Sequence, residues 1–402
     1  MRKATAVFAL ALGTALLLSG CSNPGAPSGG ADDDPIVFGA HTTLTGPLAY
    51  VGAGYSMGVE LAAKEINANG GIDGHPLEIK IVDDKGTPEG GTTAARELVE
   101  RDNVLLVMSG GVSSATIPNV PYFKSNGVVY MVSVASDPRI SEELVSNVFV
   151  GAPVTTAVAV PHYADYIQNE LDAKTVAMIV CDGGFCTSAA PLLQAELDDR
   201  GIEVVQTATF NSGDTDFTGQ VQAIDGSDPD VVFILGSAAD DGRIIPQLRR
   251  GGVDVPLVGD ITAAESTLVE AAGPAAEGLT AFWIGASQFL ADDTGVMGDW
   301  LASVEENMPD RPTGTPSLHS LMGYADVYVL AEAIRAAGGD LSSEAIAKSL
   351  ETNIKDFVAG ADENWTFAEP IALPRTFTPE DHRGNSTLTP LRVEDGKFVP
   401  VG

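Results

Sequence analysis

Residues 77–108, LEIKIVDDKGTPEGGTTAARELVERDNVLLVM, decide the fold of this chain. Leu77 to Ile81 alternates apolar and polar residues, the pattern of a strand with one buried face. Val104 to Met108 is a short apolar run, which is typical of a strand buried on both faces. The stretch between them, Pro88 to Arg101, is predicted to be a helix. A strand, a helix and another strand in succession favour a parallel sheet covered by helices.

The same alternation continues on both sides of this stretch. Further strands are predicted at 36–38, 128–132, 175–180, 204–209 and 231–235, and helices at 54–69, 155–169, 189–200, 218–224 and 242–250. Short Val, Ile and Leu runs separated by amphipathic helices predict an α/β fold with parallel sheets. The tail from Trp365 to Gly402 contains several prolines and departs from the pattern, so we expect short antiparallel strands there.

The N-terminus has the organisation of an export signal. Arg2 and Lys3 precede an apolar run from Ala6 to Leu18, and small residues follow it. The run is too short to cross about 30 Å of hydrocarbon as a permanent helix. Leu18-Ser19-Gly20-Cys21 resembles the lipobox of bacterial lipoproteins, whose cysteine is lipidated after cleavage. An ordinary secreted protein with an incidental Cys21 is the alternative.

These features predict a signal peptide over 1–20 and a flexible tether over 21–34. The tether is rich in Ser, Gly, Pro and Asp and has no apolar pattern. We therefore expect a protein that is exported and lipid-anchored to the outer face of the cell membrane.

Composition limits the classes of partner. Hydrophobic residues make up 44% of the 402 residues, enough to build cores. The net charge is −33, from 22 basic and 55 acidic residues, which disfavours binding to nucleic acid and to anionic lipid headgroups.

Two cysteines remain besides Cys21. Cys181 and Cys186 are close in sequence, and in an oxidising compartment they can form a local disulfide that stiffens a loop. A metal site is the weaker alternative, because two cysteines without nearby histidines supply too few ligands.

Candidate ligand-binding loops follow the predicted strands, because open parallel sheets bind ligands beyond the carboxyl ends of their strands. Five such loops, rich in Gly, Ser, Thr and Asp, occupy 109–116, 133–138, 181–187, 236–241 and 259–262. Glycines allow close backbone approach, and hydroxyls and helix N-termini can hold a carboxylate. Each loop could alone be a turn or a helix cap. Five together predict a small-molecule site.

Signatures of catalysis and of cofactor binding are missing. The chain has no P-loop and no GxSxG elbow, and its five histidines are scattered without metal-ligand spacing. We expect neither an enzyme nor a bound metal or cofactor.

Two neighbouring stretches carry a resemblance to a known family. These are Thr45-Gly46-Pro47-Leu48-Ala49, and the longer segment from Gly58 to Gly74 that includes Ile66-Asn67-Ala68-Asn69-Gly70-Gly71. They are similar to the opening of the branched-chain amino-acid (Leu/Ile/Val-type) substrate-binding proteins of ABC transporters. The resemblance extends over most of the mature chain.

The resemblance implies a two-lobed type I periplasmic-binding-protein fold, each lobe a parallel sheet flanked by helices, with three hinge crossovers. The crossovers are expected near 151–153, 280–283 and 355–360. They would divide the chain into a first lobe of 35–152 and 283–356 and a second lobe of 153–282 and 357–402. The resemblance also implies that the lobes close over a solute and that the closed form docks on a permease.

The resemblance also implies roles for individual residues. Ser113 and Ser136 match hydroxyl residues that hold an amino-acid carboxylate, and Val134 and Ala135 would supply backbone contacts. Phe185 and Ser237 replace residues that are often tyrosine, so the ligand can also be an amide or a small organic acid. The other candidates are Ser114, Thr262, His319 near an aromatic wall position, and Asp260 for an ammonium group.

The function implied is therefore a monomeric extracytoplasmic receptor that delivers a small polar solute to an ABC import permease. A ligand-sensing lipoprotein for a signalling partner, and an enzyme on a similar scaffold, are the alternatives.

Overall fold

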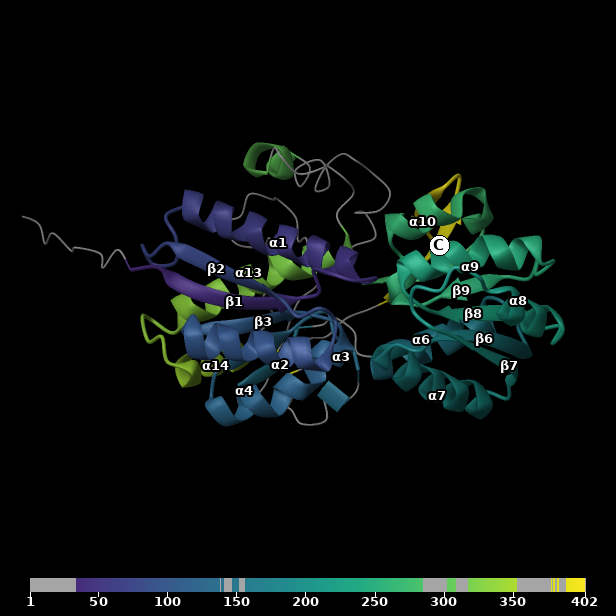
Figure 1. Cartoon of the computed structure of the whole chain (residues 1–402), viewed down its shortest axis with the longest axis horizontal. Coiled ribbons are helices and arrows are strands. Elements are labelled where there is room, and N and C mark those ends of the chain that lie inside the picture. Colours follow the sequence, from purple (N-terminus) through teal and green to yellow (C-terminus); the bar gives the residue numbers. More distant parts are fainter. Residues whose placement is uncertain are drawn as a thin grey trace, which may run out of the picture.

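The computed structural model describes residues 34–137, 139–140, 147–151, 156–284, 302–308, 317–352, 377, 379, 382 and 388–401. The predicted signal peptide, the tether and Cys21 lie outside these residues. Figure 1 shows two sheets side by side along the long axis of the molecule, each with helices on both faces. The predicted α/β fold with two mainly parallel sheets is confirmed.

The first sheet has five parallel strands in the order β2-β1-β3-β4-β5. With its helices it forms what we call the first lobe. The strands are β1 (Ile36–Thr42), β2 (Leu77–Asp83), β3 (Leu106–Gly110), β4 (Val129–Val132) and β5 (Val148–Val150). The helices are α1 (Ala49–Ala68), α2 (Pro88–Arg96), α3 (Ser113–Thr116), α4 (Val120–Asn126), α13 (Leu318–Ala336) and α14 (Ser343–Thr352), with π-helical and 3₁₀ turns η1 (Glu97–Arg101) and η2 (Ile117–Asn119).

The second sheet has seven strands in the order β12-β11-β10-β9-β8-β6-β7 and forms the second lobe. Its strands are β6 (Thr175–Cys181), β7 (Glu203–Phe210), β8 (Val231–Leu235), β9 (Leu257–Gly259), β10 (Thr280–Ile284), β11 (Leu388–Glu394) and β12 (Lys397–Pro400). Its helices are α6 (Thr156–Asn169), α7 (Gly184–Asp199), α8 (Thr218–Asp225), α9 (Ala238–Arg250) and α10 (Ser266–Ala272), with 3₁₀ turns η3 (Ile261–Ala263) and η4 (Gly273–Ala276). β11 and β12 are antiparallel, which confirms the prediction for the tail.

Three helices begin earlier than their sequence patterns predicted. α1 starts at Ala49 instead of residue 54, α7 at Gly184 instead of 189, and α9 at Ala238 instead of 242. The added first turns are rich in Gly, Ala and Ser, so they lack the apolar periodicity that marks a helix. As a result Phe185 lies in the first turn of α7 and not in a free loop.

The expected crossover at Thr280–Trp283 is wrong. These residues form β10, which pairs with β9 and β11, and Ala281, Phe282 and Trp283 are buried in the second lobe. The chain returns to the first lobe after Ile284, because Ser303 already bonds to Glu65 of α1. In the sequence, the apolar residues of β10 look like those of any buried strand. Only their pairing with β9 and β11 shows that they belong to the second lobe.

The last crossover also lies later than expected, although 355–360 itself falls outside the described residues. His382 stacks on Phe149 of β5 with 4.1 Å between ring centroids, and its carbonyl accepts from the Val150 N–H at 2.8 Å. His382 therefore packs in the first lobe, whereas Leu388 begins β11 of the second sheet. Val150 ends β5 of the first sheet and Thr156 begins α6 of the second lobe, and 152–155, which include part of the expected first crossover, lie outside the described residues.

Close packing of α1 on α13 fixes the edge of the first lobe. A Cβ on Gly58 would lie 1.8 Å from the Ser320 carbonyl oxygen, and one on Gly323 2.4 Å from the Tyr55 carbonyl oxygen. Only glycine allows the two backbones to approach this closely. The contact brings Tyr50 at the start of α1 next to His319 at the start of α13, with 5.9 Å between their ring centroids.

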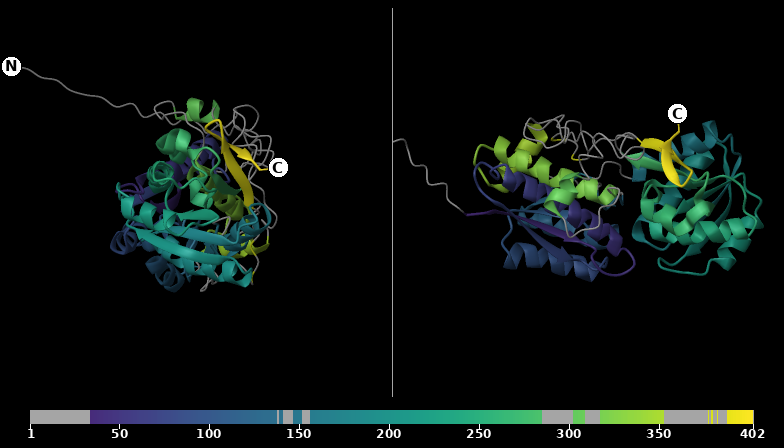
Figure 2. Two further views of the ribbon diagram at one scale, coloured as in Figure 1. Left: turned by 90° about the vertical axis from the view of Figure 1, so that its right-hand side faces the viewer. Right: turned by 90° about the horizontal axis from the view of Figure 1, so that it is seen from above.

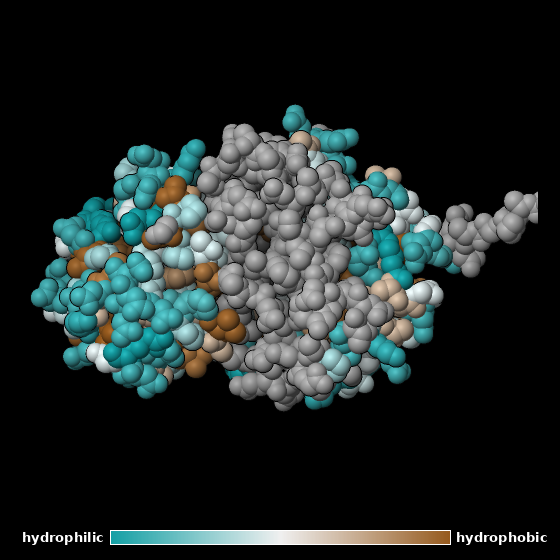
Figure 3. Space-filling model, turned by 180° about the vertical axis from the view of Figure 1, so that it is seen from behind, coloured by the Kyte–Doolittle hydropathy of each residue, from teal (hydrophilic) through white to brown (hydrophobic). Residues whose placement is uncertain are grey.

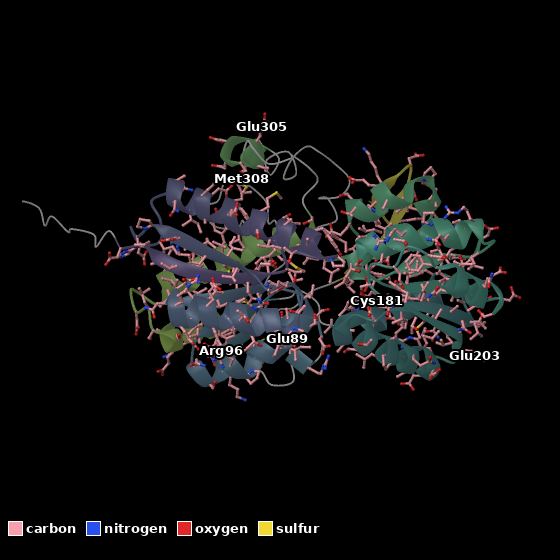
Figure 4. The ribbon with its side chains drawn as sticks, in the orientation of Figure 1. Glu89, Arg96, Cys181, Glu203, Glu305 and Met308 are labelled. Atoms are coloured by element: carbon pink, nitrogen blue, oxygen red, sulfur yellow. A yellow bond between two sulfur atoms is a disulfide. The ribbon has the colours of Figure 1, made fainter. Side chains whose placement is uncertain are left out.

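The carboxyl ends of the parallel strands in each lobe face the other lobe. Figure 4 places Cys181, the last residue of β6, on the side of the second lobe that faces the first, and Glu203, the first residue of β7, on the opposite side. The view from above also shows the two lobes apart along the long axis (Figure 2, right). On the face drawn in Figure 3, the coloured outer surfaces are mostly hydrophilic, as the acidic composition requires.

Candidate ligand-binding site

A pocket lies between the two lobes, at the carboxyl ends of both sheets. It encloses about 810 Å³ of empty space, including its open mouth, which is within the usual range for small-molecule sites. Its lining residues are Leu48, Tyr50, Val51, Val112, Ser113, Ser114, Val134, Ser136, Cys181, Gly183, Gly184, Phe185, Ser212, Gly236, Ser237, Ile261, Thr262, His319 and Met322. All five predicted loops contribute to it or to its supporting layer.

Most of the residues predicted from sequence converge on this pocket. The pocket is lined by Ser113, Ser114, Val134, Ser136, Phe185, Ser237, Thr262 and His319. Ala135 and Asp260 do not line it; they are 2% and 1% exposed and lie behind the surface. Their neighbours in the loops, not they, present groups to the cavity.

The first-lobe wall presents serine hydroxyls. Ser113 begins α3 and is buried, and Ser136 lies in the loop after β4. Ser113 and Ser114 also supply the first N–H groups of α3, and such groups have no acceptor within their own helix. The Ser114 hydroxyl donates to the Gly86 carbonyl at 2.9 Å, which ties α3 to the loop after β2.

A fully buried polar network supports this wall. Asp84 accepts hydrogen bonds from the Thr43 hydroxyl at 2.7 Å and the Gly86 N–H at 2.9 Å, and its Oδ2 lies 3.0 Å from His41 Nδ1. His41 Nε2 lies 2.7 Å from the Tyr130 hydroxyl. Burial raises the pKa of Tyr130 well above its usual value, so its hydroxyl stays protonated and can donate to His41. The network fixes the loops that carry the serines.

The second-lobe wall is built from the starts of α9 and η3. Ser237 caps α9: its Oγ accepts from the Asp240 N–H at 3.1 Å and donates to Asp240 Oδ2 at 2.8 Å. Thr262 Oγ1 lies 2.6 Å from the Gly236 carbonyl and 2.6 Å from Asp260 Oδ1. These contacts join the loops after β8 and β9.

Carboxyl groups lie directly behind this wall. Asp241 and Asp260 are fully buried, and a Cβ on Gly236 would lie 2.1 Å from Asp241 Oδ1. Burial raises the pKa of Asp260 to about 7, because the charged form loses its hydration. Burial, and then the charges of Asp260 and Asp240, raise the pKa of Asp241.

Phe185 is held by a disulfide. Cys181 at the end of β6 and Cys186 in α7 are bonded, with 5.6 Å between their Cα atoms. The residues between them include Gly183, Gly184 and Phe185, all of which line the pocket. The bond therefore fixes one wall of the site.

Sequence reasoning missed several apolar residues of the wall, above all Tyr50. Tyr50 packs edge-on against His319, and its pKa is raised by burial and then by the charges of Glu265 and Asp241. Its position three residues after the Thr45-Gly46-Pro47 turn was the available signal. Leu48, Val51, Val112, Ile261 and Met322 gave none, because isolated apolar residues are ordinary core residues in any sequence.

Two polar contacts cross the pocket between the lobes. The Ser188 hydroxyl of α7 donates to Asp137 Oδ2 of the first lobe at 2.7 Å. His319 Nδ1 of α13 lies 3.3 Å from Glu265 Oε1 at the start of α10. The lobes are thus in contact through two pairs of side chains.

Two features are absent from the described residues. No cluster of three or more His, Cys, Asp or Glu residues there is arranged to hold a metal ion. Within the same residues, no helix has the length and apolar character needed to cross a membrane.

The family model for periplasmic binding proteins matches residues 35–397, nearly the whole chain after the tether. The chain belongs to the periplasmic binding protein family. Its members are solute-binding proteins that work outside the cytoplasm, not enzymes. The resemblance to substrate-binding proteins and the expectation that the chain is not an enzyme are therefore confirmed.

Relatives of this periplasmic binding protein carry amino-acid names. An "amino acid binding protein" of Pseudomonas aeruginosa is 28% identical over 331 residues, covering 82% of this chain and 85% of the relative. The Leu/Ile/Val-binding protein BraC3 of Rhizobium johnstonii is 29% identical over 318 residues, covering 79% and 83%.

Solved structures share the fold. A leucine-binding protein of Thermotoga maritima has a TM-score of 0.78 at 19% identity, covering 91% of this chain and 98% of its own. A solute-binding protein of Rhodopseudomonas palustris, solved with 3,4-dihydroxybenzoic acid, has a TM-score of 0.77 at 20% identity, covering 92% and 97%. These likenesses support the type I fold of this periplasmic binding protein.

Proposed function

We propose that this periplasmic binding protein captures a free amino acid with an apolar side chain and delivers it to an ABC import permease. One observation carries the proposal: hydroxyls from the first lobe and hydroxyls backed by carboxyls from the second face one pocket. A zwitterion has complementary ends for these two walls. The amino-acid names of the relatives support the same ligand class.

The first-lobe wall is the carboxylate end of the proposed site. Ser113 and Ser136 offer hydroxyl donors, and the start of α3 offers N–H groups. No acidic residue is among the lining residues of the pocket.

The second-lobe wall is the ammonium end. Ser237 and Thr262 offer hydroxyl acceptors, and Asp260 and Glu265 add negative charge behind and beside them. An ammonium group placed there gains Coulomb energy in a site that is shielded from water.

Apolar residues from both lobes surround the remaining space. Leu48, Val112, Val134, Phe185, Ile261 and Met322 line it. Burying an aliphatic ligand side chain against them yields about 25 cal/mol per Å² of apolar surface.

Closure of the lobes completes the site in this proposal. The two cross-lobe contacts, Ser188 with Asp137 and His319 with Glu265, belong to the closed arrangement. The lobes would hinge at the segments that connect the two sheets. A ligand that touches both walls shifts the population toward the closed form, because it binds that form more tightly.

We also propose a monomer that is held at the outer face of the cell membrane through a lipid on Cys21. The support is the Leu-Ser-Gly-Cys sequence followed by a Ser, Gly and Pro-rich tether. A tether of this kind leaves both lobes free to move.

A thermal-shift screen tests the ligand class. The mature chain would be mixed with amino acids, amides, urea and small organic and aromatic acids. A ligand at a hundred times its Kd adds about 2.7 kcal/mol of stability. Stabilisation by leucine, isoleucine or valine supports the proposal, and stabilisation only by acids without an ammonium group contradicts it.

A further inference from the structure

No cation among the described residues forms an ion pair with the buried Asp241 or Asp260. Asp240, the next carboxyl along α9, pairs with Arg243, and Glu265 faces His319. Both oxygens of Asp241, and Oδ2 of Asp260, have no hydrogen-bond partner among the described residues, although both side chains are fully buried. Two unpaired buried carboxylates are costly, and such groups usually take up a proton instead.

Hydrogen-bond counting at Thr262 supports a proton on Asp260. Thr262 Oγ1 is 2.6 Å from both the Gly236 carbonyl oxygen and Asp260 Oδ1. The hydroxyl has one proton and the carbonyl has none. Both contacts are hydrogen bonds only if Thr262 donates to Gly236 and Asp260 donates to Thr262. A protonated Asp260 satisfies the chain, and an ionised one leaves a close contact between two oxygens without a hydrogen.

The surrounding groups favour the same protonation state. Burial raises the pKa of Asp260 to about 7 and outweighs the hydrogen bonds from Thr262 and from the Ala263 N–H, which lower it. Burial, followed by the charge of Asp260, also raises the pKa of Asp241. Tyr163 of α6, whose hydroxyl accepts from the Ile261 N–H at 3.2 Å, has a pKa raised by burial and by Asp260, so it stays neutral. No cation therefore offsets the pair from α6 or α9, apart from the Arg243 already held by Asp240.

From this geometry we infer that ligand capture is coupled to proton release: the ligand-free site stores a proton on Asp260, and an arriving ammonium group expels it. The released proton goes to solvent, and the Asp260 carboxylate then balances the charge of the ligand, while Asp241 keeps its own proton. The inference rests on the proposed function, since it requires a cationic group at the second-lobe wall. It makes affinity for an amino acid depend on pH.

The sign of the dependence follows from linkage. Binding favours the ionised form of Asp260, so affinity rises as pH increases and levels off above the ligand-free pKa of about 7. Below that pH the rise approaches about tenfold per unit, and the protons released fall from about nine-tenths at pH 6 to about one-tenth at pH 8. His319 also lines the pocket, so variants must separate its contribution from that of Asp260.

Titration calorimetry in buffers of different ionisation enthalpy measures the released protons. L-Leucine, or another amino acid that stabilises the protein, would be titrated at pH 6 in buffers such as phosphate and Bis-Tris. Equal binding enthalpies in the two buffers would overturn the inference. 4-Methylpentanoic acid, which is leucine without its ammonium group, should release no proton if it binds.

Variants assign the proton to its residue. Asp260→Asn should abolish proton release while keeping the shape of the side chain, and Asp172→Asn, a matched change at a side chain that is 88% exposed, should leave it unchanged. Release that persists in Asp260→Asn and disappears in His319→Gln would refute the assignment. If no amino acid binds, the proposed function fails; if one binds without proton exchange, only this inference fails.

Discussion

His319 Nδ1 lies 3.3 Å from Glu265 Oε1, and this contact joins helix α13 of the first lobe to the start of α10 in the second. Both side chains are buried, at 6% and 4% exposure, and the His319 ring also packs on Tyr50. A contact between buried groups that spans a cleft is made only when the lobes are together. Because His319 lines the pocket, this contact connects a residue of the pocket wall to the closure of the lobes.

Replacing His319 by Ala should weaken ligand binding by about 1–2 kcal/mol, or roughly tenfold, because an aromatic pair and a cross-lobe polar contact are lost. Calorimetry measures the affinity, and small-angle scattering measures the closed fraction. His162→Ala, on the exposed part of α6, is the control. Unchanged affinity in His319→Ala would remove this contact from the closing mechanism.

Ser113→Ala and Ser136→Ala should each weaken binding of an amino acid by about 1–3 kcal/mol, because hydrogen bonds to charged groups contribute that much. Ser125→Ala is a matched control, since Ser125 is exposed on α4 and its hydroxyl bonds to the Tyr122 carbonyl. If both pocket variants bound as tightly as the unchanged protein, the carboxylate end would have to lie elsewhere.

Removing the disulfide with Cys181→Ser and Cys186→Ser should lower the free energy of unfolding by about 2 kcal/mol, as expected for a small closed ring. Ligand affinity should fall as well, because Phe185 lies between the two cysteines and lines the pocket. Chemical denaturation measures the free energy of unfolding, and calorimetry measures the ligand affinity. Intact mass of the unchanged protein without reductant should lack two hydrogens, and two free thiols would contradict the bond.

Gly58→Ala should destabilise the first lobe by about 1–3 kcal/mol, since its Cβ would lie 1.8 Å from the Ser320 carbonyl oxygen and α13 would have to move. Gly219→Ala is the control, because a Cβ in α8 at that position meets nothing within 4 Å. The denaturant concentration at the midpoint of unfolding, measured for both variants, compares their stabilities. Equal stability of both variants would show that α1 and α13 are farther apart in solution.

Cys21→Ala should release the protein from the membrane into the medium or the periplasm. Fractionation of cells that express either form measures this. The folded lobes should be unaffected, because Cys21 lies in the segment preceding them. Persistence of Cys21→Ala in the membrane fraction would reject the lipid anchor.

The strands were predictable because their apolar runs are long enough to be buried whatever surrounds them. β8, Val231–Leu235, coincides with its predicted range, and β6 differs by one residue. Helix starts were less predictable: α7 begins in Gly184, Phe185 and Cys186, where no apolar period exists. Their helical state comes from packing against the end of β6 and not from local propensity.

The candidate site divides in the same way. Ser113, Ser136 and Ser237 were predictable because they follow strands, and parallel strands bring their carboxyl ends to one edge. Tyr50, which lines the same cavity, was missed, and nothing near Asp241 in the sequence shows that it is buried behind the cavity wall. The sequence also did not show to which lobe Trp283 and His382 belong. Their contacts decide it, because Trp283 pairs with β11 and His382 stacks on Phe149.

The order of hydrophobic runs and helices by itself determined that this protein is an α/β structure with hydroxyl-rich loops at its strand ends. Burial of its apolar residues places each run in a sheet. Because the strands are parallel, the loops that follow them lie at the same edge of the sheet. Only the tertiary structure decided that Thr262, Gly236 and Asp260 share one hydrogen-bonded chain over the unpaired Asp241. The protonation of a carboxyl depends on the groups that fold around it, and these come from segments far apart in the sequence.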